Sequence, residues 1–332
     1  MPQKTARDPL VTSPLYNGTE VLSMSQNQSN TRAYSAAHFG LTLSDEGSAA
    51  SKDIGLFRSI EGGGVRADVA SYQQGGHFNR WRQLGKPKFE DIKLQVGMAM
   101  SKPFYDWISA FFKKQPTRKN GSIIAADFYY GERAVREFSG ALIKELTFPA
   151  LSGSDKNAVY MGVAMAVEEI KFKKGSGSKM DPPKGFDNQK LWTAANFTFT
   201  IYGFEEACKR VTKVDSFTIK QNIAEYYAGG FRGPIKAPTV VEFPNISFYI
   251  PESDAQPFFE HAQKGVVKGA LPAGLKGTLK TFDNAGKDLF TVQMENCDVI
   301  SVTPDKSDAT SEEIKLVKVE LYTEEMSFSY AG

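Results

Sequence analysis

The two halves of this sequence resemble each other, and this internal repeat constrains the fold more than any other feature. Five features recur in the same order at offsets of 154 to 156 residues, whereas one coincidence of this kind would mean little. They are a Gly-Gly turn (ASYQQGG at 70–76, AEYYAGG at 224–230), a helix-starting proline (Pro103, Pro257), a loop glycine (Gly121, Gly277), paired acids (Glu168-Glu169, Glu324-Glu325) and a phenylalanine in the closing strand (Phe172, Phe328). A strand-like segment (86–96, 237–250) lies between the turn and the proline in both copies. We infer an internal duplication.

The repeat singles out equivalent turn positions in the two copies. They are Tyr72, Gly75 and Gly76 in the first copy, and Tyr226 or Tyr227, Gly229 and Gly230 in the second. We assign Tyr227 as the counterpart of Tyr72. The glycine-rich stretches at 61–69 and 229–236 contain neither GxxxxGK[ST] nor GxGxxG, and they lie between strand-like segments. We therefore expect turns or bulges there, not phosphate loops.

The chain is long enough for two domains, since it has 332 residues. Residues 1–35 are rich in Ser, Asn, Gln and Thr, which predicts a flexible N-terminal arm. Gly, Ser, Pro and Lys gather at 173–192, which predicts a linker. The remaining segments, 36–172 and 193–332, are the two expected domains.

Each copy is expected to contain one amphipathic helix whose apolar side chains face the core. Pro103 suits the first turn of a helix, and Ser101 is a candidate cap. The apolar residues follow at helical spacing, and they are Phe104, Trp107, Ile108 and Phe111 in the first copy and Ala255, Phe258, Phe259 and Ala262 in the second. We interpret these aromatic residues as core anchors, in preference to a cofactor or carbohydrate site at Phe104 or Trp107.

The rest of each copy alternates apolar and polar residues with a period of two. Clear examples are 197–203, 215–227 and 314–322, with a hairpin turn expected at Asp283–Gly286. In 314–322, Lys315, Val317 and Val319 share one face. The prediction is a mainly β protein, with two tandem barrels or sandwiches of about six or seven strands and one helix each.

The composition argues against several functional classes. Lys and Arg number 40 and Asp and Glu 38, a net charge of +2, which does not suit a general electrostatic nucleic-acid binder. We expect no transmembrane helix, because no run of about 18 apolar residues occurs. The N-terminus has no apolar segment typical of a secretory signal. Cys208 and Cys297 are expected to be buried thiols.

No catalytic, metal-binding or cofactor-binding residue is predicted. His38, His77 and His261 are far apart and have no ligand spacing, and neither HExxH nor CxxC occurs. The adjacent acids Glu168-Glu169 and Glu324-Glu325 lie in strand-like runs, where neighbours point to opposite faces. We therefore interpret them as solvated or intersubunit charges, not as an acid/base pair.

The order of these elements resembles that of the tail-tube protein family of contractile phage tails and contractile injection systems. The similarity rests on EYYAGG at 225–230, KAPTVVEFPNISFYI at 236–250 and QPFFEH at 256–261, and on their counterparts ASYQQGG, KPKFEDIKLQVGMAM and FYDWISAFF in the first copy. Trp107 stands where the family has its helix aromatic, and His261 takes that place in the second copy. The resemblance covers nearly all of 37–172 and 193–330.

The resemblance implies a conduit without enzymatic activity or cofactors. The chain would build rings of an inner tube that lets DNA or protein cargo pass without specific binding. Its partners would be copies of itself and sheath, baseplate or tail-terminator proteins, with no membrane. The localisation implied is the virion tail or injection particle, assembled in the bacterial cytoplasm.

The chain departs from the family in carrying two domains, an N-terminal arm and an insertion at 44–55. Family subunits carry one domain and form hexameric rings, so three copies of this chain would form a pseudo-sixfold ring. The arm and the insertion would serve ring stacking. Six chains in two stacked rings, or a second domain outside the tube, are alternatives.

Other functions compete with the polymeric tube. A single-ring tube initiator or baseplate adaptor would share the fold. The secreted tube protein of type VI systems also shares the barrel but has one domain. In another class, a β-rich hydrolase would be expected to carry one asymmetric cluster of functional residues.

Overall fold

A computed structural model describes residues 35–48, 51–73, 75–76, 78, 80–180, 191–230, 232–305 and 314–331. Nearly all of the expected arm (1–35) and the middle of the expected linker lie outside these residues. The segment Ala36–Gly332 forms one unit by its internal contacts. We call residues 36–172 the first half and residues 193–332 the second half.

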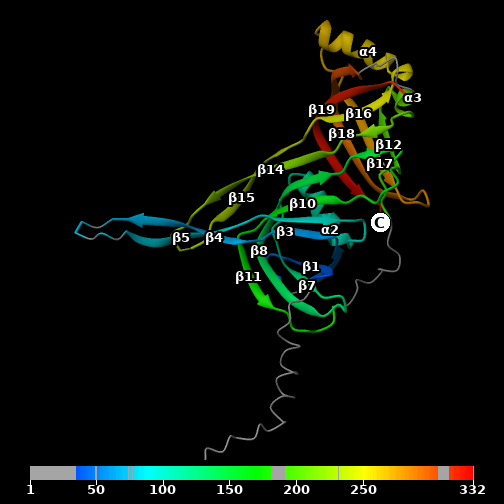
Figure 1. The fold of residues 1–332 in the computed structure, drawn as a ribbon. Helices are drawn as coiled ribbons and strands as arrows, with labels where there is room; N and C mark the ends of the chain where they lie inside the picture. The colour runs from blue at the N-terminus through cyan, green and yellow to red at the C-terminus, as the bar shows by residue number, and fades with distance from the viewer. Residues whose placement is uncertain are drawn as a thin grey trace, which may run out of the picture. The chain divides into compact units, whose positions relative to one another are not determined.

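The first half is built from strands and one long helix (Figure 1). Its elements are β1 (His38–Asp45), β2 (Lys52–Phe57), β3 (Ser59–Gly62), β4 (Val65–Tyr72), β5 (Trp81–Phe89), β6 (Ile92–Val96), α2 (Lys102–Phe112), β7 (Lys119–Ala126), β8 (Glu132–Phe148), β9 (Leu151–Ser152), β10 (Met161–Ala166) and β11 (Glu169–Lys174). Part of the expected insertion at 44–55 is thus strand, because β2 pairs with β1.

The second half follows a similar order and adds one short helix, α3. Its elements are β12 (Phe197–Ile201), α3 (Glu205–Cys208), β13 (Lys213–Val214), β14 (Phe217–Tyr226), β15 (Ile235–Glu242), β16 (Ile246–Pro251), η2 (Glu252–Asp254), α4 (Gln256–Ala262), η3 (Gln263–Val267), β17 (Leu275–Phe282), β18 (Asp288–Pro304) and β19 (Leu316–Tyr330). The expected turn at Asp283–Gly286 joins β17 to β18, where Gly286 N donates to Asp283 O. The mainly β prediction is confirmed.

The two large sheets have the same strand order. In the first, the order is β1-β7-β8-β10-β6-β3, with β2 outside β1 and β11 beside β8. In the second, it is β12-β17-β18-β19-β16-β13. The single strand β19 is thus the counterpart of both β10 and β11. All of these pairings are antiparallel, so the repeat seen in the sequence has a counterpart in the topology.

The two longest strands contain a left-handed residue at equivalent positions. Gly140 in β8 has φ of 63° and Asn296 in β18 has φ of 52°, and the two residues are 156 apart. The pairing of β18 with β19 skips from Glu295 to Cys297 at this point. Glycine and asparagine adopt this conformation with the least strain. The same interruption therefore occurs in both long strands.

Strands from each half complete the sheet of the other. β14 of the second half pairs with the end of β8, through Phe217–Phe148 and Lys220–Glu145 among its partners. β9 of the first half pairs with β13 and so extends the second sheet. The halves are joined by main-chain hydrogen bonds as well as by the chain between them.

The long helix α2 begins as expected, but its cap differs. Ser101 stands at the N-cap with extended backbone, yet its hydroxyl makes no capping bond and is buried without a partner. The prediction of a capping hydroxyl is wrong, because the hydroxyl is buried and makes no bond to the first turn. The remaining signal for the start of the helix is Pro103, whose fixed φ suits the first turn.

The expected helix anchors lie in the core. Phe104, Trp107, Ile108 and Phe111 of α2 are buried, and so is Phe258 of α4. Phe259 and Ala262 are half-buried and pack against the same core. The Trp107 Nε1 donates a 2.9 Å hydrogen bond to Thr117 O, which satisfies its polar atom inside the protein.

Candidate functional site

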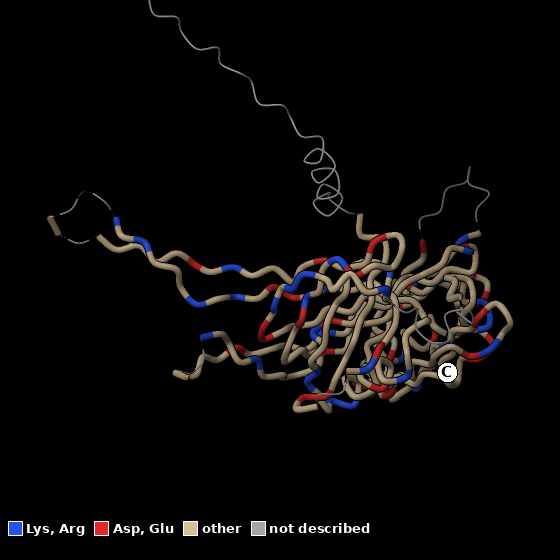
Figure 2. Tube along the Cα trace, turned by 90° about the horizontal axis from the view of Figure 1, so that it is seen from below, with Lys and Arg blue, Asp and Glu red and all other residues tan. Residues whose placement is uncertain are grey.

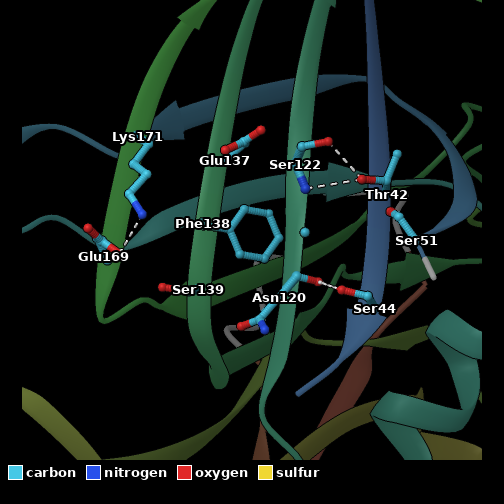
Figure 3. Close-up of a pocket in the computed structure, with 11 residues that line it drawn as sticks. Thr42, Ser44, Ser51, Asn120, Ser122, Glu137, Phe138, Ser139, Glu169 and Lys171 are labelled. Carbon is cyan, nitrogen blue, oxygen red and sulfur yellow. Dashed lines mark hydrogen bonds and ion pairs between the residues drawn. The ribbon is translucent and has the colours of Figure 1, made fainter. Parts of the chain in front are cut away.

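One surface depression is a polar patch on the face of the first sheet (Figure 3). Side chains of β1, β7, β8 and β11 line it, and the Thr42 and Ser122 hydroxyls lie 2.7 Å apart. Lys171 and Glu169 form an ion pair of 3.2 Å at its edge. These hydroxyls and charges bond to one another, in the manner of an outward sheet face, and we assign no chemistry to them.

The titratable residues of the described chain do not form a metal centre. No group of three or more His, Cys, Asp or Glu residues gathers there. His38 stacks on Tyr130 with ring centroids 3.9 Å apart, whereas His261 contacts Asp298 at 2.6 Å, and His77 lies outside the described residues. Burial raises the pKa of the Cys208 thiol to about 11, and it raises that of Cys297 as well.

The predicted turn positions occupy the tips of two hairpins. Gly75 and Gly76 lie in the turn between β4 and β5, and Gly229 and Gly230 lie in the turn between β14 and β15. An added Cβ at any of these four glycines would meet no atom within 4 Å, so the tips are open. The two turns are therefore surface features at the same place in each half.

The strand pairing changes which tyrosine of the second half is equivalent to Tyr72. Tyr72 pairs with Trp81 at the end of the first hairpin, and Tyr226 pairs with Ile235 at the end of the second. Both members of the second pair lie 154 residues beyond the first pair. Tyr226, not Tyr227, is the counterpart of Tyr72. Tyr227 instead receives a cation–π contact of 4.5 Å from Lys86 of β5.

The structure brings the helix anchors and the second hairpin together at one place, which we call the intrachain junction. It has two parts: β14 and β15 on the end of β8, and α2 on the end of β19. The rings of Phe148 and Phe217 stack at 4.8 Å across the first part. Those of Phe112 and Phe328 stack at 5.8 Å across the second. Such pairs stabilise beyond the apolar area that they bury.

A buried lysine fixes the second hairpin to the first half. The side chain of Lys236 in β15 is 4% exposed, and its Nζ lies 3.8 Å from Asp91. Its backbone N–H donates a 2.8 Å bond to Glu168, and its carbonyl accepts a 2.6 Å bond from Arg118. Glu168 belongs to one of the acid pairs found in the sequence. Its carboxylate is thus part of the junction, not a solvated charge.

Two ion pairs add electrostatic links at the junction and beside it. Lys114, just after α2, lies 3.0 Å from Glu325 in β19. Lys144 lies 2.6 Å from Asp91, and this bond raises the pKa of the lysine. Elsewhere acidic and basic residues are interspersed along the chain (Figure 2). The contacts are thus specific pairs and not one charged face.

The first half lacks the corresponding contacts for its own hairpin. Within the described residues, β4 and β5 pair only with each other. Val65, Val69 and Trp81 are exposed on this hairpin. This difference is not predictable from the sequence, because both hairpins carry the same pattern.

A protein-family model matches the first half of the chain. Residues 35–173 match the family model described as T4-like virus tail tube protein gp19. The search of curated proteins found no match. No helix in the described part of the chain is long and apolar enough to cross a membrane.

Three solved structures illustrate the similarity. One is the anti-feeding prophage baseplate, at 16% identity over 43% of this chain and 97% of that chain, with a TM-score of 0.35. Another is the sheath–tube complex of an extracellular contractile injection system, PVC, at 18% identity over 41% and 89%, with a TM-score of 0.33. The Hcp1 protein from E. coli EAEC 042 matches at 20% identity over 35% and 73%, with a TM-score of 0.22. The first half of this chain, residues 35–173, is thus similar to the tail-tube protein family of T4-like viruses.

Proposed function

We propose that the chain is a non-enzymatic subunit of the inner tube of a phage tail or contractile injection system. The observation that carries the proposal is the tail-tube match of the first half, together with the identical strand order in the second. The chain would supply two tube domains, a duplication that the common order of β-strand pairings supports. Its role would be assembly. The extensive β-structure with interspersed charges is more typical of a tube wall than of a ligand-binding cleft.

The duplication favours rings of three chains. Three two-domain chains supply six domains, which gives a pseudo-sixfold ring on threefold symmetry. DNA or protein cargo would pass through the lumen without specific binding. Sheath, baseplate or terminator proteins would contact the outside or the ends, in a particle assembled in the bacterial cytoplasm. A single-ring initiator or adaptor at the tail tip is the second candidate, since it needs the same surfaces without ring stacking.

Electron microscopy of the purified chain tests this function. We expect rings with six lobes, built from three chains, and tubes where rings stack. Rings that never stack would favour the initiator or adaptor. Discrete monomers at high concentration, also in the presence of tail partners, would overturn the tube function. Rings that contain six chains would overturn the threefold symmetry.

A further inference from the structure

We infer that the intrachain junction is repeated between successive chains, so that β4 of one chain adds to the end of β18 in a second copy, while α4 of that second copy packs on β11 of the first chain. This interface rests on the proposed ring function and specifies its surfaces and register. Each part of the junction inside the chain has equivalent residues in the opposite half, by the offsets of the repeat.

The first part of the junction is strand addition. β14 pairs with β8 only along Phe217–Lys220, which lie opposite Glu145–Phe148. β8 pairs with β10 on its other side at this level. In the second half, the equivalent stretch of β18 is Ser301–Pro304, and among the described strands it pairs with β19 alone. Among the described residues, no strand thus occupies on β18 the side that β14 occupies on β8.

The hairpin that would fill this site is β4 with β5. At an offset of 154 residues, the docked segment Phe217–Lys220 corresponds to Gly63–Arg66. Val65 and Arg66 begin β4 and are therefore the strand residues expected to pair, whereas Gly63 and Gly64 precede the strand. Ile219 is fully buried at the junction, whereas its counterpart Val65 is 48% exposed. An open strand edge beside exposed apolar residues is a template for pairing with another chain. The expected occupant is β4 of another copy, because the equivalent strand β14 already pairs with β8 inside the chain.

The second part of the junction is a helix on a strand. Phe112, at the end of α2, packs on Phe328, which is 5% exposed. The equivalent residues are Val266 after α4, which is exposed, and Phe172 in β11, which is 59% exposed. Apolar side chains that are buried inside the chain thus have exposed counterparts at both ends.

The ionic contact of the junction also has a counterpart. Lys114 and Glu325 lie 3.0 Å apart within the chain. Their equivalents by the offsets of the repeat are Lys268 and Glu169, which carry the same charges. Lys268 follows η3 beside α4, and Glu169 begins β11. Opposite charges at these two positions favour the same docking direction as the apolar residues.

Both parts of the contact run in one direction along the chain. Inside the chain, the second half gives its hairpin and the first half gives its helix. At the next junction, the first half of one chain would give β4 and β5, and the second half of its neighbour would give α4. Such a head-to-tail contact uses different surfaces on the two partners, and it closes into a ring when the rotation permits.

The intrachain pairs fix the expected register. Lys220 opposite Glu145 translates to Arg66 opposite Ser301, and Ile219 opposite Leu146 translates to Val65 opposite Val302. Side chains directly opposite in an antiparallel pair have Cβ atoms about 4.5–5.5 Å apart, close enough for an engineered disulfide with a small adjustment. A shift of one residue places the side chains on opposite faces.

Cysteine cross-linking tests the interface. The variant Arg66→Cys/Ser301→Cys should form interchain disulfides that yield covalent dimers and trimers on a non-reducing gel, with the trimer as the largest product. Lys220→Cys/Glu145→Cys, the same pair inside the chain, is the positive control and should link without a change of mass. Arg66→Cys/Val302→Cys controls for register, and each single cysteine variant controls for Cys208 and Cys297, which are buried.

The outcomes separate the interface from the function. Rings in the microscope, with the intrachain control linked but no interchain product, would overturn this interface and leave the tube function intact. Equal linking by the register control would also overturn it, because pairing would then be unspecific. A ladder of products beyond three chains would overturn closure on three chains. Absence of rings together with absence of links would remove both proposals.

Discussion

The hydroxyl of Ser109 in α2 donates a 3.0 Å hydrogen bond to the main-chain carbonyl of Phe328, which lies 219 residues later in β19. The bond joins the helix of the first half to the final strand of the second. Tyr105 and Tyr330 stack beside it with centroids 3.9 Å apart. The core of the first half is thus completed by the end of the chain.

This contact predicts a large effect of truncating Phe328. Its ring is buried among Phe112, Phe148 and Phe290. Phe328→Ala should lower the free energy of unfolding by about 3–5 kcal/mol, because it removes apolar contacts and leaves a cavity. Urea unfolding of the unassembled chain measures this change. The matched control is Phe172→Ala at the equivalent exposed position, which should stay within about 0.5 kcal/mol; equal losses in both variants would contradict the assignment.

A charge exchange tests the helix part of the proposed interface. Lys268→Glu and Glu169→Lys should each raise the concentration needed for ring formation, because attraction is replaced by repulsion. An exposed pair contributes up to about 1 kcal/mol, so each contact should weaken by roughly fivefold. Sedimentation or mass photometry at several concentrations measures the shift. The double exchange should recover most of the loss, and a double variant no better than either single one would speak against direct pairing.

The left-handed residue in β8 predicts a specific response to substitution. Gly140→Ala should cost about 1–2 kcal/mol, because a non-glycine residue is strained at φ of 63°. An added Cβ would also crowd the Glu168 carboxylate, which holds Lys236. Gly140→Asn adds the same Cβ but should cost less in backbone strain, since Asn296 already adopts this conformation in β18. Thermal unfolding compares them, with Asn296→Gly as the neutral reference; equal tolerance of alanine and asparagine would argue against backbone strain.

The hydrogen bonds of Asp298 predict that the free energy of unfolding depends on pH. Burial raises its pKa, but hydrogen bonds from His261 and from the backbone N–H groups of Ala273 and Val299 outweigh this and hold the pKa below its usual value. A lowered folded-state pKa means that the stabilisation is present above the unfolded-state value of about 3.9 and is lost as the pH falls through the folded-state value. Asp298→Asn should therefore cost about 1–3 kcal/mol at pH near 5.

The difference between the wild type and Asp298→Asn should shrink as the pH falls below about 4. Denaturant unfolding at several pH values measures it. Asp288→Asn, on the same strand but half exposed, is the control and should show a small effect throughout. A difference that stays constant down to pH near 3 would show that the carboxylate charge is not what stabilises this site.

The sequence predicts much of the fold because the repeat contains residues that favour one local structure, such as a helix start or a turn. Pro103 and Pro257 mark the two helices, and the glycine pairs mark the two hairpin tips. The period-two pattern places Val317 and Val319 on one face, and both are buried. These signals depend on neighbours in sequence, which propensity and periodicity describe.

The junction could not be predicted in the same way. Thr147 and Thr218 share a 2.9 Å hydrogen bond across 71 residues, and no local sequence pattern predicts this bond. Because β4 and β14 carry equivalent sequences, the pattern alone does not tell which hairpin is docked. Ser101 shows the same limit, since its position before the helix is recognisable in the sequence but the burial of its hydroxyl is not.

The strand exchange at β8 has a consequence for how a ring would be put together. In the proposed ring, every chain would arrive with one of each two successive junctions already formed, so closing six domains would take three contacts between chains where six separate subunits would need six. The covalent connection would also set the composition, because the two kinds of domain would alternate around the ring in one-to-one proportion. Features present in only one half, such as strand β2, would then recur at every second position around the circumference.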